Sequence, residues 1–170
     1  MPESVRILGI DPGSQITGFG IIEASVNKTL LVGRGTVRTA GGEHIGRLEQ
    51  IFRGLIKVVE EYRPQEIAIE RVFMHRNPDS ALKLGQARSA ALCATFDAGV
   101  PIHEYAARQV KQSVVGNGGA DKAQIQHMVR LLLSIRDELQ ADAADALAVA
   151  LCHAFRRRTR DLLSKAVVRA

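Results

Sequence analysis

The stretch LGIDPGSQITGFGIIE, residues 8–23, contains two apolar runs joined by a short polar turn, and Asp11 closes the first run. Asp-Pro-Gly is a common tight turn, because proline fixes one backbone angle, glycine accepts an unusual one, and the aspartate can hydrogen-bond the backbone beyond it. Local sequence alone therefore favours a turn-forming role for Asp11. The apolar runs also predict a buried strand that ends at this acid and a second strand that follows it.

The hydrophobic period changes in an orderly way along the rest of the chain. Three strands at the start are typical of an antiparallel meander, and strands then alternate with helices. This order predicts an α/β fold with a mixed five-stranded sheet flanked by α-helices. The predicted strands are 5–10, 17–24, 30–39, 66–70 and 102–106, and the predicted helices are 45–62, 80–98, 106–115, 122–134 and 141–158.

Length and composition indicate a single domain with a sizeable core, since 46% of the 170 residues are hydrophobic and 24% are charged. No apolar stretch is long enough to span a bilayer, and the N-terminus lacks a basic segment followed by an apolar one. Cys93 and Cys152 lie in apolar helical patterns without metal-ligand spacing, which predicts reduced core residues. We therefore expect a cytoplasmic protein that does not associate with a membrane.

Basic charge is concentrated in two parts of the chain, although the formal net charge is only +5. Residues 156–170 hold six basic residues against Asp161 alone, and this tail is expected to be disordered. Residues 71–130 hold eight basic residues against four acidic ones. A basic middle and tail could face nucleic acid, whereas ordinary solvated charge explains any single residue equally well.

Four acids occupy positions that could bring them together. Glu70 ends its strand as Asp11 ends its own, and parallel neighbouring strands would present both carboxylates at one edge of the sheet. Asp142 and Asp145 are three residues apart on one face of a helix. Acids are common in a first helical turn, but this helix is apolar nearly all round, so burial of a lone carboxylate there would be costly.

Convergence of these four carboxylates would require positive charge. Two unit charges about 4 Å apart repel by about 4 kcal/mol at an effective dielectric constant near 20. An all-carboxylate set without His or Cys suits magnesium or manganese. Paired ions of this kind assist in-line displacement at phosphorus, so the pattern indicates phosphodiester hydrolysis.

Five motifs then identify a family: GIDPGS (9–14), AIERVF (68–73), NPDSALKLGQARSAA (77–91), YAARQVKQSVVG (105–116) and ADAADALA (141–148). Together they resemble the RuvC family of Holliday junction resolvases, with similarity over residues 5–153. The resemblance implies a ribonuclease H-like fold, with a nuclease domain over residues 1–155. It also implies a homodimer that cuts four-way DNA junctions by two symmetric nicks in recombination and repair, together with the RuvA and RuvB branch-migration complex.

The resemblance assigns the catalytic metal site to Asp11, Glu70, Asp142 and Asp145. These residues would bind two Mg²⁺ ions per subunit, with Mn²⁺ able to substitute, and the nicks would leave 5′-phosphate and 3′-hydroxyl ends. Some relatives have His at the last of these positions, whereas this chain has Asp145. No metal-ligand spacing is shared by His75, His103, His127 and His153.

Seven further residues are assigned to DNA contact. Lys111 and Lys122 match family positions near the scissile phosphate or the backbone, although surface lysines need no such role. Phe73 matches an aromatic that stacks on bases at the opened crossover, although an aromatic directly after a strand is more often core. The assigned residues are Phe73, His75, Arg76, Lys83, Arg108, Lys111 and Lys122.

Two other classes of protein share features of this sequence but fit it less well. An actin-like or sugar-kinase-type ATPase also begins with a strand, an acid and a glycine turn, but needs two such domains. A non-catalytic junction-binding protein would have no use for four converging acids.

The helix around residues 84–88 is the candidate dimer interface, because its small side chains would allow close approach. The residues assigned to it are Leu84, Gly85, Ala87 and Arg88.

Overall fold

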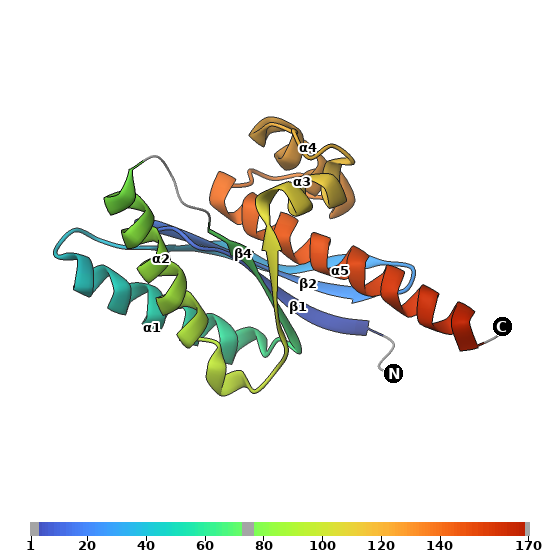
Figure 1. Ribbon diagram of the computed structural model, residues 1–170, viewed down its shortest axis with the longest axis horizontal. Coiled ribbons are helices and arrows are strands. Elements are labelled where there is room, and N and C mark those ends of the chain that lie inside the picture. The colour runs from blue at the N-terminus through green and yellow to red at the C-terminus, as the bar shows by residue number, and fades with distance from the viewer. Residues whose placement is uncertain (1–3, 73–76, 169–170) are drawn as a thin grey trace.

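A computed structural model describes residues 4–72 and 77–168 and shows a five-stranded sheet between two layers of helices (Figure 1). This arrangement confirms the predicted α/β class and the mixed sheet. The strands are β1 (Ser4–Asp11), β2 (Ile16–Ser25), β3 (Thr29–Arg38), β4 (Glu66–Arg71) and β5 (Ile102–Ala106). The helices are α1 (His44–Tyr62), α2 (Pro78–Cys93), the 3₁₀ turn η1 (Phe96–Ala98), α3 (Ala107–Val115), α4 (Lys122–Leu132) and α5 (Ala141–Val168).

The sheet has the strand order β3-β2-β1-β4-β5. The first three strands form the predicted antiparallel meander, while β4 runs parallel to both β1 and β5. The carboxyl ends of β1, β4 and β5 therefore meet at one edge of the sheet, where open sheets bind their ligands.

Two hydrophobic cores lie on opposite faces of the sheet. One core joins the sheet to α1 and α2, and its central side chains include Leu8, Ile51 and Ile69. The other core joins the sheet to α5, α3 and α4, and includes Ile7 and Leu147. Figure 1 shows α1 and α2 together on one side and α5 crossing the other side beneath α3 and α4.

Glycines in β1 and β2 let α5 lie directly on the sheet. A Cβ atom added at Gly9 would stand 2.2 Å from the carbonyl oxygen of Ala146, and one at Gly18 would stand 1.9 Å from that of Asp142. Small residues on the facing side of α5, including Ala146 and Ala150, are fully buried. Backbone-to-backbone packing of this kind fixes the height of α5 above the strands.

The last helix is longer than the sequence indicates. We expected it to end near Arg158, with a disordered tail from residue 156, but α5 continues to Val168, so the tail prediction was wrong for residues 156–168. Arg157 accounts for part of the difference, since its guanidinium donates to Glu66 Oε1 (3.0 Å) and to Asp161 Oδ2 (3.4 Å). Residues 169 and 170 lie outside the described part of the chain.

Two smaller expectations also differ from the structure. The second predicted helix was expected to reach Ala98, but α2 ends at Cys93 and η1 follows after a turn. Cys152 is buried as expected, whereas Cys93 is exposed. In the described part of the chain, no helix is both long enough and apolar enough to cross a membrane.

Substitution of Gly9 by alanine will test the contact between α5 and the sheet. The added methyl group overlaps the α5 backbone, so we expect Gly9→Ala to lower the free energy of unfolding by about 3 kcal/mol in urea titrations. Gly46→Ala in α1 is the matched control, because a Cβ there meets nothing within 4 Å, and it should stabilise the protein by up to about 1 kcal/mol. Equal stability of the two variants would contradict this packing.

Candidate metal centre

Asp11 and Glu70 lie side by side at the carboxyl ends of neighbouring parallel strands. In the β1–β4 register Ile10 is opposite Ile69, and the two acids follow one residue later on each strand. Side chains alternate along a strand, so Asp11 shares the face of Gly9, which lies against α5. Both acids therefore belong to the α5 side of the sheet.

The first turns of α5 bring two more acids to the same place. Asp11 is opposite Gly18 in the β1–β2 register, and the backbone of Asp142 rests on Gly18. Asp145 follows one turn later, and 17% of its side chain is exposed. The start of α5 is thus held over the end of β1 by the close contact between helix and sheet.

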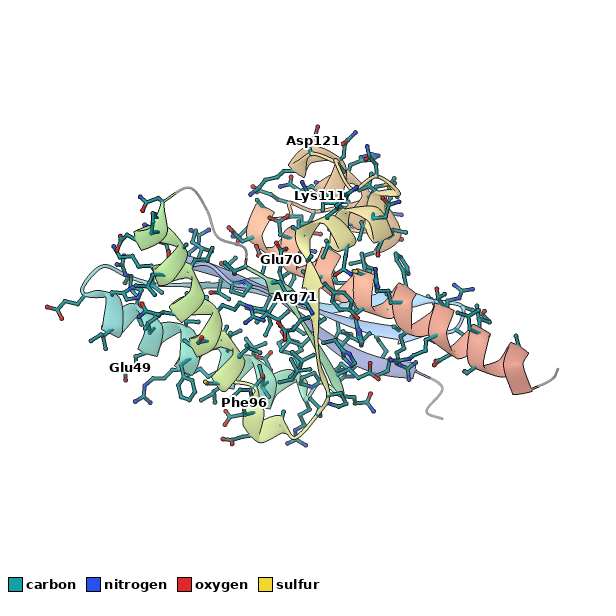
Figure 2. The ribbon with its side chains drawn as sticks, viewed as in Figure 1. Glu49, Glu70, Arg71, Phe96, Lys111 and Asp121 are labelled. Atoms are coloured by element: carbon teal, nitrogen blue, oxygen red, sulfur yellow. The ribbon has the colours of Figure 1, made fainter. Side chains whose placement is uncertain are left out.

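A cavity of about 280 Å³ opens where these elements meet. Asp11, Glu70 and Asp145 line it, whereas Asp142 does not, although the charge of Asp142 acts on both other aspartates. Figure 2 shows Glu70 and Lys111 at this end of the sheet and Phe96 at the opposite end. The other lining residues are Ala107, Val110, Lys111, Lys122, Ile125 and Ala148.

Burial and mutual repulsion make the negative charge at this cavity costly. Burial, followed by the charges of Glu70, Asp145 and Asp142, raises the pKa of Asp11 to about 8. Burial and the charge of Asp145 raise the pKa of Glu70 to about 7, against the opposing effect of Lys111 and Lys122. Burial also raises the pKa of Asp145.

The donor set fits hard divalent cations. The acidic side chains at the cavity offer only carboxylate oxygens, and neither His nor Cys is among the residues that line it. The ion pair between Lys122 and Asp145 is weak, because the Nζ of Lys122 is 3.7 Å from Asp145 Oδ2 and the lysine side chain is 79% exposed. A divalent ion would neutralise more charge than this lysine does.

The residues assigned to DNA contact do not all lie near the cavity. Lys111 and Lys122 line it, and Arg108 is exposed on α3, where its side chain covers Gly118. Lys83 is on α2, on the other side of the sheet, and pairs with Asp79 one turn earlier (2.7 Å). The remaining three lie outside the described residues: Phe73, His75 and Arg76.

Comparison with known proteins decides the family. The family model for crossover junction endodeoxyribonuclease RuvC matches residues 7–153. The chain is 55% identical over 164 residues to the protein of that name from Methylococcus capsulatus, which covers 96% of this chain and 99% of the relative. This chain belongs to the RuvC family. The assignment makes it a nuclease and implies dependence on a divalent metal.

Solved structures agree with the RuvC assignment. The structure described as T. thermophilus RuvC in complex with Holliday junction substrate has a TM-score of 0.83 and 35% identity, and the match covers 91% of this chain and 96% of that one. The yeast mitochondrial Holliday junction resolvase Ydc2 shares the fold, with a TM-score of 0.60 over 91% of this chain and 80% of its own, at 14% identity. Neither the ATPase nor the non-catalytic alternative is favoured by these relatives.

A second group of titratable residues lies at the opposite end of β4 in this RuvC chain. Glu66, His103 and His153 place metal-ligand atom types within 4.8 Å of one another, which no spacing in the sequence indicated. The rings of the two histidines are stacked, with centroids 4.3 Å apart. Both ring nitrogens of His153 also lie within hydrogen-bond distance of protein oxygens.

Hydrogen bonds within the protein account for this second group. His153 is buried, and its Nδ1 and Nε2 lie 2.7 Å from the Tyr105 hydroxyl and 2.5 Å from Glu66 Oε2. Burial lowers the pKa of His153. Burial alone would raise the pKa of Glu66, but hydrogen bonds from His153 and Arg157 outweigh it, and the pKa is lowered. The group therefore fastens α5 to the sheet.

The raised acid pKa values predict a pH-dependent effect of Asp11→Asn. The folded protein retains protons that the unfolded chain releases near pH 4, so these acids reduce stability as pH rises from about 4 toward about 8. In the presence of a chelator, Asp11→Asn should raise the free energy of unfolding by about 1–3 kcal/mol at about pH 8.5 and change it little at about pH 4. Urea titrations at both pH values measure this.

The exposed Asp97 supplies the control, since Asp97→Asn should give no such gain at the higher pH. An Asp11→Asn variant that is no more stable than the parent protein at about pH 8.5 would show that this carboxylate is not repelled by its neighbours.

Proposed function

We propose that this chain resolves four-way DNA junctions by magnesium-dependent hydrolysis during recombination and repair. The observation that carries the proposal is the cavity in which β1, β4 and α5 each contribute a carboxylate, with two lysines beside them. A RuvC relative at 35% identity has been solved with Holliday junction substrate, which supports a junction as the substrate here. Two symmetric nicks would leave 5′-phosphate and 3′-hydroxyl ends.

Asp11, Glu70, Asp142 and Asp145 would hold two Mg²⁺ ions, with Mn²⁺ able to replace them. When bound, such ions activate a water molecule and stabilise the charge that develops on the leaving 3′ oxygen. The carboxylates come from rigid strands and from a helix packed on them, so they are positioned before substrate binds. The rest of the cavity is lined by the apolar side chains of Ala107, Val110, Ile125 and Ala148.

The basic residues around the cavity would hold the DNA backbone. Lys111 and Lys122 lie at the cavity itself, and Arg108 is on the same helix as Lys111. In the sequence, β4 is followed within five residues by Phe73, His75 and Arg76. The family resemblance supports contact of these residues with the opened crossover. Lys83 lies on α2, and its contact with DNA would require an arm of the junction to reach that side of the molecule.

A homodimer built on α2 would supply two such sites to the two strands of a junction. A hollow of about 560 Å³ beside this helix includes Leu82 and Gly85, and Leu82 is 64% exposed. Two residues expected in the interface are engaged within the subunit instead: Ala87 is fully buried in the core, and Arg88 bonds to Glu70 and Glu104. The other two residues assigned to the interface, Leu84 and Gly85, are half-buried and lie beside the exposed Leu82 on α2.

The proposal extends to the cellular setting of the enzyme. The family resemblance supports cooperation with the RuvA and RuvB branch-migration complex, and we place the protein in the cytoplasm, where bacterial chromosomal DNA is found.

Removal of single ligands will test the catalytic assignment. Glu70→Gln and Asp142→Asn should each reduce magnesium-dependent nicking of a synthetic four-way junction by roughly 100-fold or more, because each variant loses a carboxylate that would hold the metal ions. Junction binding in a gel-shift assay without metal should remain or improve. Glu49→Gln, at an exposed residue of α1, is the control. Magnesium-dependent nicking by either site variant at the rate of the control would refute the assignment.

The salt dependence of junction binding will test whether Lys122 contacts a phosphate of the DNA. Lys122→Ala should weaken junction binding at all sequences and reduce the slope of log binding constant against log salt concentration by about 1. Lys57→Ala on α1 is the comparison, since this exposed lysine lies on the opposite side of the sheet. Identical slopes for the two variants would exclude a phosphate contact by Lys122.

A further inference from the structure

Arg88 joins helix α2 to the strand end that carries Glu70. Its Nε donates a hydrogen bond to the backbone carbonyl oxygen of Glu70 at 3.2 Å, and only 18% of its side chain is exposed. Glu70 is the next-to-last residue of β4, and strand ends open more easily than strand centres. Glu70 is opposite Tyr105 of β5, whereas the β1–β4 register ends at Ile69, so the contact falls where β4 is paired on one side only.

The same guanidinium is held from a second strand. Its NH2 group donates to Glu104 Oε2 on β5, and the Nε of Arg71 is 3.8 Å from that same oxygen. Glu104 is directly opposite Ile69 in the β4–β5 register, next to the residue whose carbonyl Arg88 binds. A planar guanidinium can bridge two acceptors at once in a fixed geometry, which a lysine ammonium cannot reproduce.

Arg88 approaches Glu70 from the side of the sheet opposite to the cavity. Ile67 and Ile69 point into the core beneath α1 and α2, whereas Ala68 belongs to the core beneath α5. By alternation, the Glu70 side chain points to the α5 side, where it lines the cavity. Arg88 therefore cannot reach the reacting atoms and can act only through the backbone of Glu70.

We propose that Arg88, braced by Glu104, is a positioning residue that holds the end of β4 so that Glu70 presents its carboxylate to the metal centre. The inference rests on the proposed function, because Glu70 must be a ligand for its position to matter. It also makes the metal site dependent on α2, the helix next to the proposed dimer surface. Supporting residues around metal ligands typically change metal affinity or activity by roughly 10- to 100-fold when they are replaced.

Metal binding without DNA gives the direct test. In calorimetric titrations with Mn²⁺, Arg88→Ala should weaken binding roughly tenfold, and Arg88→Lys and Glu104→Gln should weaken it less. The Mg²⁺ concentration for half-maximal nicking should rise in the same order, while junction binding without metal is retained. Arg53→Ala is the matched control, since Arg53 forms an exposed pair with Glu49 one turn away (2.7 Å) and should leave both quantities unchanged.

The results for Glu70 and for Arg88 distinguish the proposed metal-ligand set from the positioning role of Arg88. If Glu70→Gln keeps the metal affinity of the parent protein, the proposed ligand set fails. If Glu70→Gln loses affinity but Arg88→Ala and Arg88→Lys match Arg53→Ala, the positioning role is overturned. If Arg88→Ala does not fold, Arg88→Lys and Glu104→Gln decide, and parental metal affinity in both overturns the proposal. Affinity that recovers fully at higher protein concentration would assign the effect to subunit association instead, and would also overturn it.

Discussion

Negative charge buried at one edge of the sheet is the constraint on which the rest of the structure depends. Asp11 and Glu70 occupy the carboxyl ends of β1 and β4, and α5 adds Asp145 from above. Burial of these groups and repulsion among them oppose the packing of α5, and the raised pKa values of all three acids reflect burial first and repulsion second. The apolar contacts between α5 and the glycines of β1 and β2 must therefore supply the free energy that holds the acids together. Folding thus places the carboxylates in an electrostatically unfavourable arrangement, which bound cations would relieve.

Helix α5 performs two separate tasks along its length. Its first turns carry Asp142 and Asp145 to the cavity, and its middle is buried on the sheet almost without polar side chains. Further along, His153 and Arg157 bind Glu66 at the amino end of β4. The helix is thus attached to β4 far from the cavity, so the acids at its start sit on a support that does not depend on their own unfavourable interactions.

The two faces of the sheet also have different relations to the site. The α5 face carries the carboxylates, whereas the α2 face carries Arg88, which binds the backbone of Glu70 from behind. Acids on one face and an arginine on the other place opposite charges on either side of a single strand end. If α2 faces a second subunit, as proposed, and also holds the backbone of a metal ligand, it would connect assembly with catalysis.

Sequence patterns alone determined the α/β class, the five strands and their meander, because alternation and helical periodicity are local properties of the chain. They also drew attention to four acids, since strand-end and helix-face positions can be counted from the sequence. They failed for residues 156–168, where a basic composition suggested a tail and a long-range contact of Arg157 with Glu66 favours helix. Only the tertiary structure decided that Ala87 is core and that Glu66, His103 and His153 meet. The reason is that such contacts depend on how close helices lie to the sheet, and this distance is fixed by packing between residues far apart in the chain.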